Sequence, residues 1–118
     1  MFNSLTNKYA IIGGRDFNNY QSLKNIMAVQ EGVNLIISGG ARGADSLAER
    51  FAKENNIPFK LFPADWDKFG KSAGYKRNVQ IINACDVVVA FWDGHSKGTK
   101  HSIDIAKSLN KKLQVYNY

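Results

Sequence analysis

Five short apolar runs alternate with helix-like patterns along this chain of 118 residues. Between the runs, apolar residues recur at the three- and four-residue spacing of an amphipathic helix, most clearly from Ala44 to Ala52. Short strands that read as continuous apolar runs are typical of a parallel sheet that is covered by helices on both faces. The runs cover residues 9–12, 33–37, 59–62, 87–92 and 113–116.

This alternation predicts an α/β fold, namely a three-layer, Rossmann-like domain with a five-stranded, mostly parallel sheet, right-handed crossovers and about four helices. Further helical patterns lie around Leu23, around Tyr75 and over residues 99–109. The length of 118 residues and a hydrophobic content of 44% fit one domain over residues 1–118. Residues 63–72 form the longest stretch without a regular pattern, and such loops are often functional.

Cysteine content and hydropathy exclude several classes of protein. Cys85 is the only cysteine, so no internal disulfide can form. We find no signal-peptide pattern, and no apolar run approaches the roughly 20 residues that cross a bilayer. His95 and His101 fit no zinc-ligand spacing, so we expect no metal site and no required cofactor. These features predict a soluble, cytoplasmic protein without a membrane partner.

The net charge of +6 favours an anionic partner, but the position of the cations matters more than their sum. Three arginines, Arg15, Arg42 and Arg77, lie in or beside predicted loops or helix starts, whereas Arg50 lies within a predicted helix. A planar guanidinium group suits phosphate. Most lysines are scattered along the chain and are interpreted as a solvated surface.

Glycine-bearing loops follow three of the predicted strands, at residues 13–17, 38–45 and 93–100. The middle loop connects an apolar run to a helix, whose first N–H groups and positive dipole end favour a nearby anion. Because parallel strands end at the same edge of a sheet, the three loops should gather there. We therefore predict a phosphate-binding site at this edge. Asp45 either contacts a ribose or only complements the helix dipole.

Several motifs occur together in a specific order: GGRDF at 13–17, SGGARGAD at 38–45, PADW at 63–66, GYKRN at 74–78, and FWDG with SKGTKHS over 91–102. This combination resembles the YspA-like family of the SLOG superfamily, which is named after the DNA-processing protein A group and the LOG cytokinin-activating hydrolases. The resemblance implies a Rossmann-like fold that binds nucleotides or NAD-derived ligands at the glycine loops. By position, it implies a phosphate-binding loop at Gly39, Gly40, Arg42 and Gly43, a second loop at Gly98 and Thr99, and a ligand-facing Arg77.

The chain departs from the LOG hydrolases at one position. Those enzymes place a glutamate three residues after the threonine of the second loop, where this chain has Ser102, and no glutamate follows Glu54. Cleavage of an N-glycosidic bond needs a nearby carboxylate. The set of catalytic residues of the LOG hydrolases is therefore incomplete in this chain. Asp93 and Arg77 are the candidate catalytic residues. The aspartates that follow predicted strands and could substitute for the glutamate are Asp16, Asp45, Asp65 and Asp93.

We expect the chain to bind a phosphate-bearing nucleotide, or an NAD- or ADP-ribose-derived ligand, as a sensor or sequestering module. A nucleotide N-glycosidase is the second hypothesis, and single-stranded nucleic-acid binding ranks third because few aromatic residues lie among the lysines. SLOG relatives commonly pair, so a homodimer or higher homo-oligomer stays open.

We expect Trp66 to contact the ligand and Trp92 to belong to the core. The predicted ligand-binding residues are Gly13, Gly14, Arg15, Asp16, Ser38, Gly39, Gly40, Ala41, Arg42, Gly43, Asp45, Asp65, Trp66, Arg77, Asn78, Asp93, Gly94, Gly98, Thr99 and Lys100.

Overall fold

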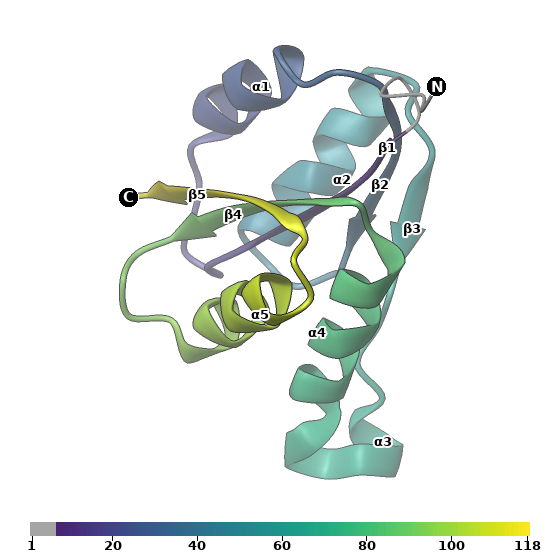
Figure 1. Cartoon of the computed structure of the whole chain (residues 1–118), viewed down its shortest axis with the longest axis vertical. Coiled ribbons are helices and arrows are strands. Elements are labelled where there is room, and N and C mark those ends of the chain that lie inside the picture. Colours follow the sequence, from purple (N-terminus) through teal and green to yellow (C-terminus); the bar gives the residue numbers. More distant parts are fainter. Residues whose placement is uncertain (1–6) are drawn as a thin grey trace.

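Five parallel strands form one sheet in the computed structural model, which describes residues 7–118. All four strand pairings are parallel, and the strand order is β3-β2-β1-β4-β5 (Figure 1). The predicted α/β fold is confirmed, with strand ends within about two residues of the predicted ones. The strands are β1 (Asn7–Gly13), β2 (Val33–Ser38), β3 (Phe59–Leu61), β4 (Val87–Trp92) and β5 (Lys112–Asn117).

Four helices cover the two faces of this sheet and create the three layers (Figure 1). α1 (Tyr20–Ala28) and α2 (Ala44–Glu54) pack on one face, and α4 (Ala73–Ala84) and α5 (Lys97–Ser108) pack on the other. No helix among residues 7–118 is long and apolar enough to cross a membrane.

Side chains of the central strand β1 alternate between the two halves of the core. Tyr9 and Ile11 join the cluster under α1 and α2, whereas Ala10 and Ile12 join the cluster under α4 and α5. A strand whose successive side chains are all buried must be apolar throughout, which explains the continuous apolar runs in the sequence.

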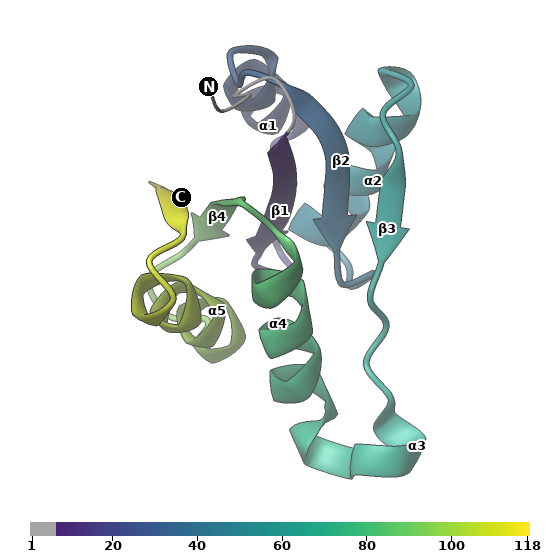
Figure 2. The same cartoon turned by 45° about the vertical axis from the view of Figure 1, so that its right-hand side comes forward.

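The segment at residues 63–72 differs from the expectation of an irregular loop. It contains a one-turn helix, α3 (Trp66–Phe69), and a 3-10 turn, Gly70–Ser72. Asp65 explains the helix, because its carboxylate accepts the N–H of Lys68 at 3.1 Å and so caps the first turn. Figure 2 shows that α3 lies beyond the carboxyl ends of β2 and β3, at the far end of the molecule from their starts.

The strand order places a crevice between β1 and β4. From β1 the chain moves outward in one direction through β2 and β3, and it then returns to add β4 and β5 on the other side of β1. The loops that leave β1 and β4 therefore turn toward opposite faces of the sheet and diverge. In open α/β sheets, ligands bind at this point of divergence.

Candidate functional site

A cavity of about 450 Å³ opens at the carboxyl ends of β1 and β4. Its volume lies within the range of small-molecule sites. The loops after β1 and β4 form two of its walls, and the β2–α2 loop and the inner face of α4 complete it. We call it the switch-point cavity, and it is lined by Ile12, Gly13, Gly14, Arg15, Asp16, Ala41, Asp45, Arg77, Asn78, Ile81, Asp93, Ser96, Gly98, Thr99 and Ser102.

The first two glycine loops pack directly against each other beside this cavity. The N–H of Ala44 donates to the carbonyl oxygen of Gly14 at 3.2 Å. Gly43 has a φ of +75°, and a Cβ built there would lie 2.3 Å from the same carbonyl oxygen. A side chain at Gly43 would thus push the loops apart, which explains glycine at this position.

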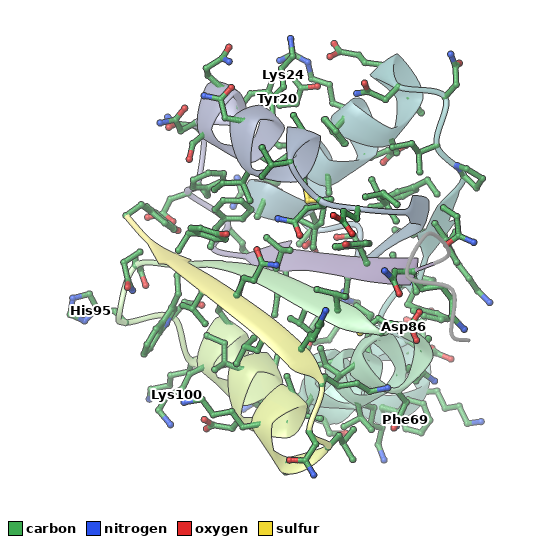
Figure 3. The ribbon with its side chains drawn as sticks, turned by 45° about the horizontal axis from the view of Figure 1, so that its top comes forward. Tyr20, Lys24, Phe69, Asp86, His95 and Lys100 are labelled. Atoms are coloured by element: carbon green, nitrogen blue, oxygen red, sulfur yellow. The ribbon has the colours of Figure 1, made fainter. Side chains whose placement is uncertain are left out.

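The third loop is held by hydrogen bonds that begin helix α5. Asp93 Oδ1 accepts the N–H groups of His95 and Ser96, both at 2.8 Å, and these bonds lower the pKa of Asp93. The Ser96 hydroxyl caps α5 by accepting the N–H of Thr99 at 3.4 Å. Ser96 and Gly98 therefore bring the positive end of α5 to the cavity wall. His95 instead points away from the molecule (Figure 3).

Asp45 is a buried carboxyl group in the wall of the cavity, with 7% of its surface exposed. Its Oδ2 atom accepts the N–H of Ala41 at 3.1 Å and so ties the β2–α2 loop to the first turn of α2. Burial raises the pKa of Asp45, although the hydrogen bond from Ala41 and the charge of Arg77 act in the opposite direction. The contact to Ala41 gives Asp45 a role in loop geometry, beyond the two roles considered from the sequence.

Arginines supply the positive charge of the site. Arg77 reaches from α4 to the β2–α2 loop, where Nη1 donates to the carbonyl oxygen of Gly39 at 2.7 Å. Burial lowers the pKa of Arg77. The charge of Asp45 acts in the opposite direction, whereas the charge of Arg15 lowers the pKa of Arg77 further. Arg15 and Arg42 make no hydrogen bond or ion pair with residues 7–118, whereas Arg50 pairs with Glu54 on the surface of α2. The two unpaired guanidinium groups are thus available to an anion.

A second cavity, of about 360 Å³, adjoins the first on the side of β3 and α3. The two share Arg15, Ala41 and Arg77 in their linings. We call it the outer cavity, and its other lining residues are Gly39, Gly40, Arg42, Leu61, Pro63, Ala64 and Trp66. Of the residues predicted as the phosphate-binding loop, Gly39, Gly40 and Arg42 line only the outer cavity, and Gly43 lines neither cavity.

Several predicted ligand-binding residues lie elsewhere. Ser38 is fully buried and its hydroxyl donates to the carbonyl oxygen of Ile11 at 2.9 Å, so the prediction that it faces a ligand is wrong. Lys100 lies on the solvent side of α5 and pairs with Asp104 at 2.9 Å (Figure 3). It follows Thr99 directly in the helix, and successive residues of a helix point in different directions around its axis, so its side chain points away from the cavity that Thr99 lines. Asp65 caps α3, and Gly94 lies in an exposed turn; neither lines the two cavities.

Several side chains at or beside the site are not among the predicted ligand-binding residues. Ile12 and Ile81 line the floor as part of the core, and Ser96 could have been recognised from its spacing to Thr99, which is typical of a helix cap. Tyr118 donates its hydroxyl hydrogen to Asp16 at 2.5 Å, and burial together with Asp16 raises the pKa of Tyr118. No local pattern could indicate a contact between residues 102 positions apart.

The carboxylates at the cavity are engaged by protein donors. Asp16 accepts from Tyr118, Asp45 from Ala41, and Asp93 from the start of α5. Ser102 lines the cavity and is 3% exposed. Among residues 7–118, no group of three His, Cys, Asp or Glu side chains could hold a metal ion.

Two solved structures share this fold. DNA processing protein A from Streptococcus pneumoniae matches with a TM-score of 0.77 and 17% identity, over 93% of this chain and 50% of that one. The same protein from Helicobacter pylori, solved for its single-stranded DNA binding mode, matches with a TM-score of 0.69 and 22% identity, over 92% of this chain and 64% of that one. The chain thus spans half to under two thirds of the length of these proteins.

Sequence comparisons identify the family. The Gene 61 protein of Mycobacterium phage D29 is 42% identical over 90 residues, which is 71% of this chain and 70% of the phage protein. The model of the YspA, cpYpsA-related SLOG family matches residues 8–69, which include the first two glycine loops and β1 to α3. From the family match and the phage relative, we conclude that the chain belongs to the YspA, cpYpsA-related family of the SLOG superfamily.

Proposed function

We propose that this protein binds a phosphate-bearing nucleotide in the switch-point cavity, as a sensor or sequestering module. The observation that carries the proposal is the convergence of two glycine loops, the capped start of α5 and the unpaired Arg15 on one cavity of about 450 Å³. Backbone N–H groups at a helix start, together with a guanidinium group, are suited to phosphate.

The charges of the cavity also support an anionic ligand. Arg15 and Arg77 are close enough for each charge to act on the other, and Arg15 has no protein partner within residues 7–118. A phosphate between them would neutralise this repulsion in a partly buried site, where charge interactions are stronger than in bulk water. Ligands of this class include mononucleotides and NAD- or ADP-ribose-derived compounds.

Holding a nucleotide is better supported than cleaving it. Ser102 stands where the related hydrolases have glutamate, and Asp16, Asp45 and Asp93 each accept hydrogen bonds from the protein. An N-glycosidase would use one of these carboxylates to stabilise charge or to activate water. Incubation with a nucleotide panel tests this alternative, because an N-glycosidase would release free base and would lose that activity in Asp93→Asn.

Isothermal titration calorimetry with AMP, and with adenosine as the ligand without phosphate, tests the proposed binding. AMP should bind and adenosine should bind far more weakly. Arg15→Ala should weaken AMP binding roughly tenfold to a hundredfold, the range for a hydrogen bond to a charged group. Arg50→Ala is the matched control, because Arg50 pairs with Glu54 and lines neither cavity. Equal AMP affinity in Arg15→Ala and Arg50→Ala would contradict the proposed site.

Single-stranded nucleic acid is the second candidate, favoured by a surface at α3. Trp66 and Phe69 are exposed, and the ammonium groups of Lys68 and Lys76 lie 5.2 and 4.7 Å from the Phe69 ring centroid. Residues 66–76 thus supply two exposed aromatic rings and two neighbouring lysines on one surface, a combination typical of single-strand binding. Oligonucleotide affinity that falls steeply with salt, while AMP affinity changes little, would favour this candidate.

A further inference from the structure

We infer that the ligand contains two nucleoside-type units joined through phosphate, and that the second unit stacks on Trp66 in the outer cavity. This inference rests on the proposed function, because the first unit occupies the switch-point cavity. Two observations support it. The two cavities meet at Arg15 and Arg77, and the walls of the two cavities differ in chemistry.

Arg77 stands at the junction in a defined position. Its Nη1 donates to the carbonyl oxygen of Gly39 at 2.7 Å and its Nε to Asn78 Oδ1 at 3.1 Å. A Cβ built at Gly39 would lie 2.5 Å from Nη1, so the guanidinium group rests directly on the loop. A guanidinium group has five N–H donors, and two are engaged here. The others, with the unpaired Arg15, suit a phosphate that joins a unit in one cavity to a unit in the next.

The outer cavity offers an apolar surface that a phosphate alone would not need. Leu61 and Trp66 are large apolar side chains that line it, yet 47% and 53% of their surfaces are exposed. Pro63 and Ala64 continue this wall, while Arg42 adds a cation that has no protein partner within residues 7–118. An exposed aromatic ring beside cations is the usual platform for a nucleobase, since every base has a π-face.

Hydrogen bonds hold the helical turn that carries Trp66. Asp65 caps the helical turn that carries it, and the N–H of Phe69 donates to the carbonyl oxygen of Asp65 at 3.0 Å. A Cβ built at Gly74 would lie 3.4 Å from Trp66 Cη2, so the indole rests against the start of α4. A side chain on an ordered turn has less conformational freedom to lose on binding than one on an unstructured loop.

Two sources share this ligand chemistry: a dinucleoside linked by pyrophosphate, and two consecutive nucleotides of a single strand. The test compares AMP, diadenosine pyrophosphate and the 5′-phosphorylated deoxyadenosine dinucleotide by titration calorimetry. At least one two-unit ligand should bind roughly fivefold to a hundredfold more tightly than AMP, the range for one stacked base. The ligand that shows the gain identifies the source.

Variants of Trp66 test whether the gain in affinity of the two-unit ligand arises in the outer cavity. Trp66→Ala should remove the gain of the two-unit ligand over AMP, whereas Trp66→Phe should keep part of it. Tyr75→Ala is the control, because Tyr75 is 47% exposed on α4 and lines neither cavity. If AMP binds but neither two-unit ligand binds more tightly, or if the gain survives in Trp66→Ala, the inference is overturned and the proposed function stands. If none of the three ligands binds, both are overturned.

Discussion

The contact between the two glycine loops predicts a graded series of glycine-to-alanine variants. At Gly43, alanine would meet two costs, a positive φ of +75° and a Cβ position 2.3 Å from the Gly14 carbonyl oxygen. At Gly94, φ is +87° and no atom lies within 4 Å of the Cβ position, so only the backbone cost applies. Gly98 has neither cost and lies in the first turn of α5.

The expected magnitudes follow from these differences. An unfavourable backbone conformation costs about 1–3 kcal/mol, and forcing extra volume into a packed contact costs about 1–3 kcal/mol more. For 118 residues, the unfolding entropy is roughly 0.25 kcal/mol per kelvin. Gly94→Ala should therefore lower Tm by roughly 4–12 °C and Gly43→Ala by roughly 8–24 °C. Gly98→Ala should raise Tm slightly, since alanine is favoured over glycine by about 0.5–1 kcal/mol within a helix.

Thermal unfolding followed by circular dichroism measures this order. A loss of about 2–6 kcal/mol for Gly43→Ala lies near or below the typical stability of a small domain, so most of the protein should remain folded at low temperature. The essential comparison is between Gly43→Ala and Gly94→Ala, because both have a positive φ and only one has a close backbone neighbour. A Tm for Gly43→Ala equal to or above that of Gly94→Ala would refute the packing argument.

Two further predictions concern polar groups beneath the β2–α2 loop. Burial raises the pKa of Asp45, so the folded protein holds this proton more tightly than the unfolded chain does. The free energy of unfolding should therefore decrease as the pH rises above 3.8, the ordinary pKa of an aspartate. The Tm of Asp45→Asn relative to the parent should therefore increase between about pH 3 and about pH 7, and a relative decrease would contradict this. Ser38→Ala should cost about 1 kcal/mol in chemical denaturation, while its AMP affinity should match the parent because the hydroxyl bonds to Ile11 and not to a ligand. A large loss of affinity without loss of stability would return Ser38 to the site.

The sequence predicted the fold well because its signal is periodic and local. The apolar runs and the stripe from Ala44 to Ala52 reflect burial on both faces of strands and on one face of a helix, and the structure contains those elements. α3 was missed because four residues are too few for a helical period to be recognised. Its cap, Asp65, was interpreted from the sequence as a carboxylate after a strand and as a ligand-binding residue, and not as a helix cap.

The candidate site was predicted at the level of loops and less well at the level of side chains. Parallel strands bring their following loops to one edge, so the positions of Gly13, Asp93 and Thr99 followed from topology. The direction of a single side chain did not, as Ser38 at the end of β2 points into the core and Lys100 in α5 points into solvent. The contact of Arg77 with Gly39 joins residues 38 positions apart and has no local pattern.

The walls of the switch-point cavity come from segments spread between Ile12 and Ser102. A chain in which any one of β1, β2, α4 or β4 is unfolded therefore has no complete site, and an occupant should bind only the fully folded form. Ligand at about 100 times its Kd would then add about 2.7 kcal/mol to the stability of the whole molecule. Hydrogen exchange should slow accordingly in the central strands as well as in the loops, because they open in the same global unfolding event.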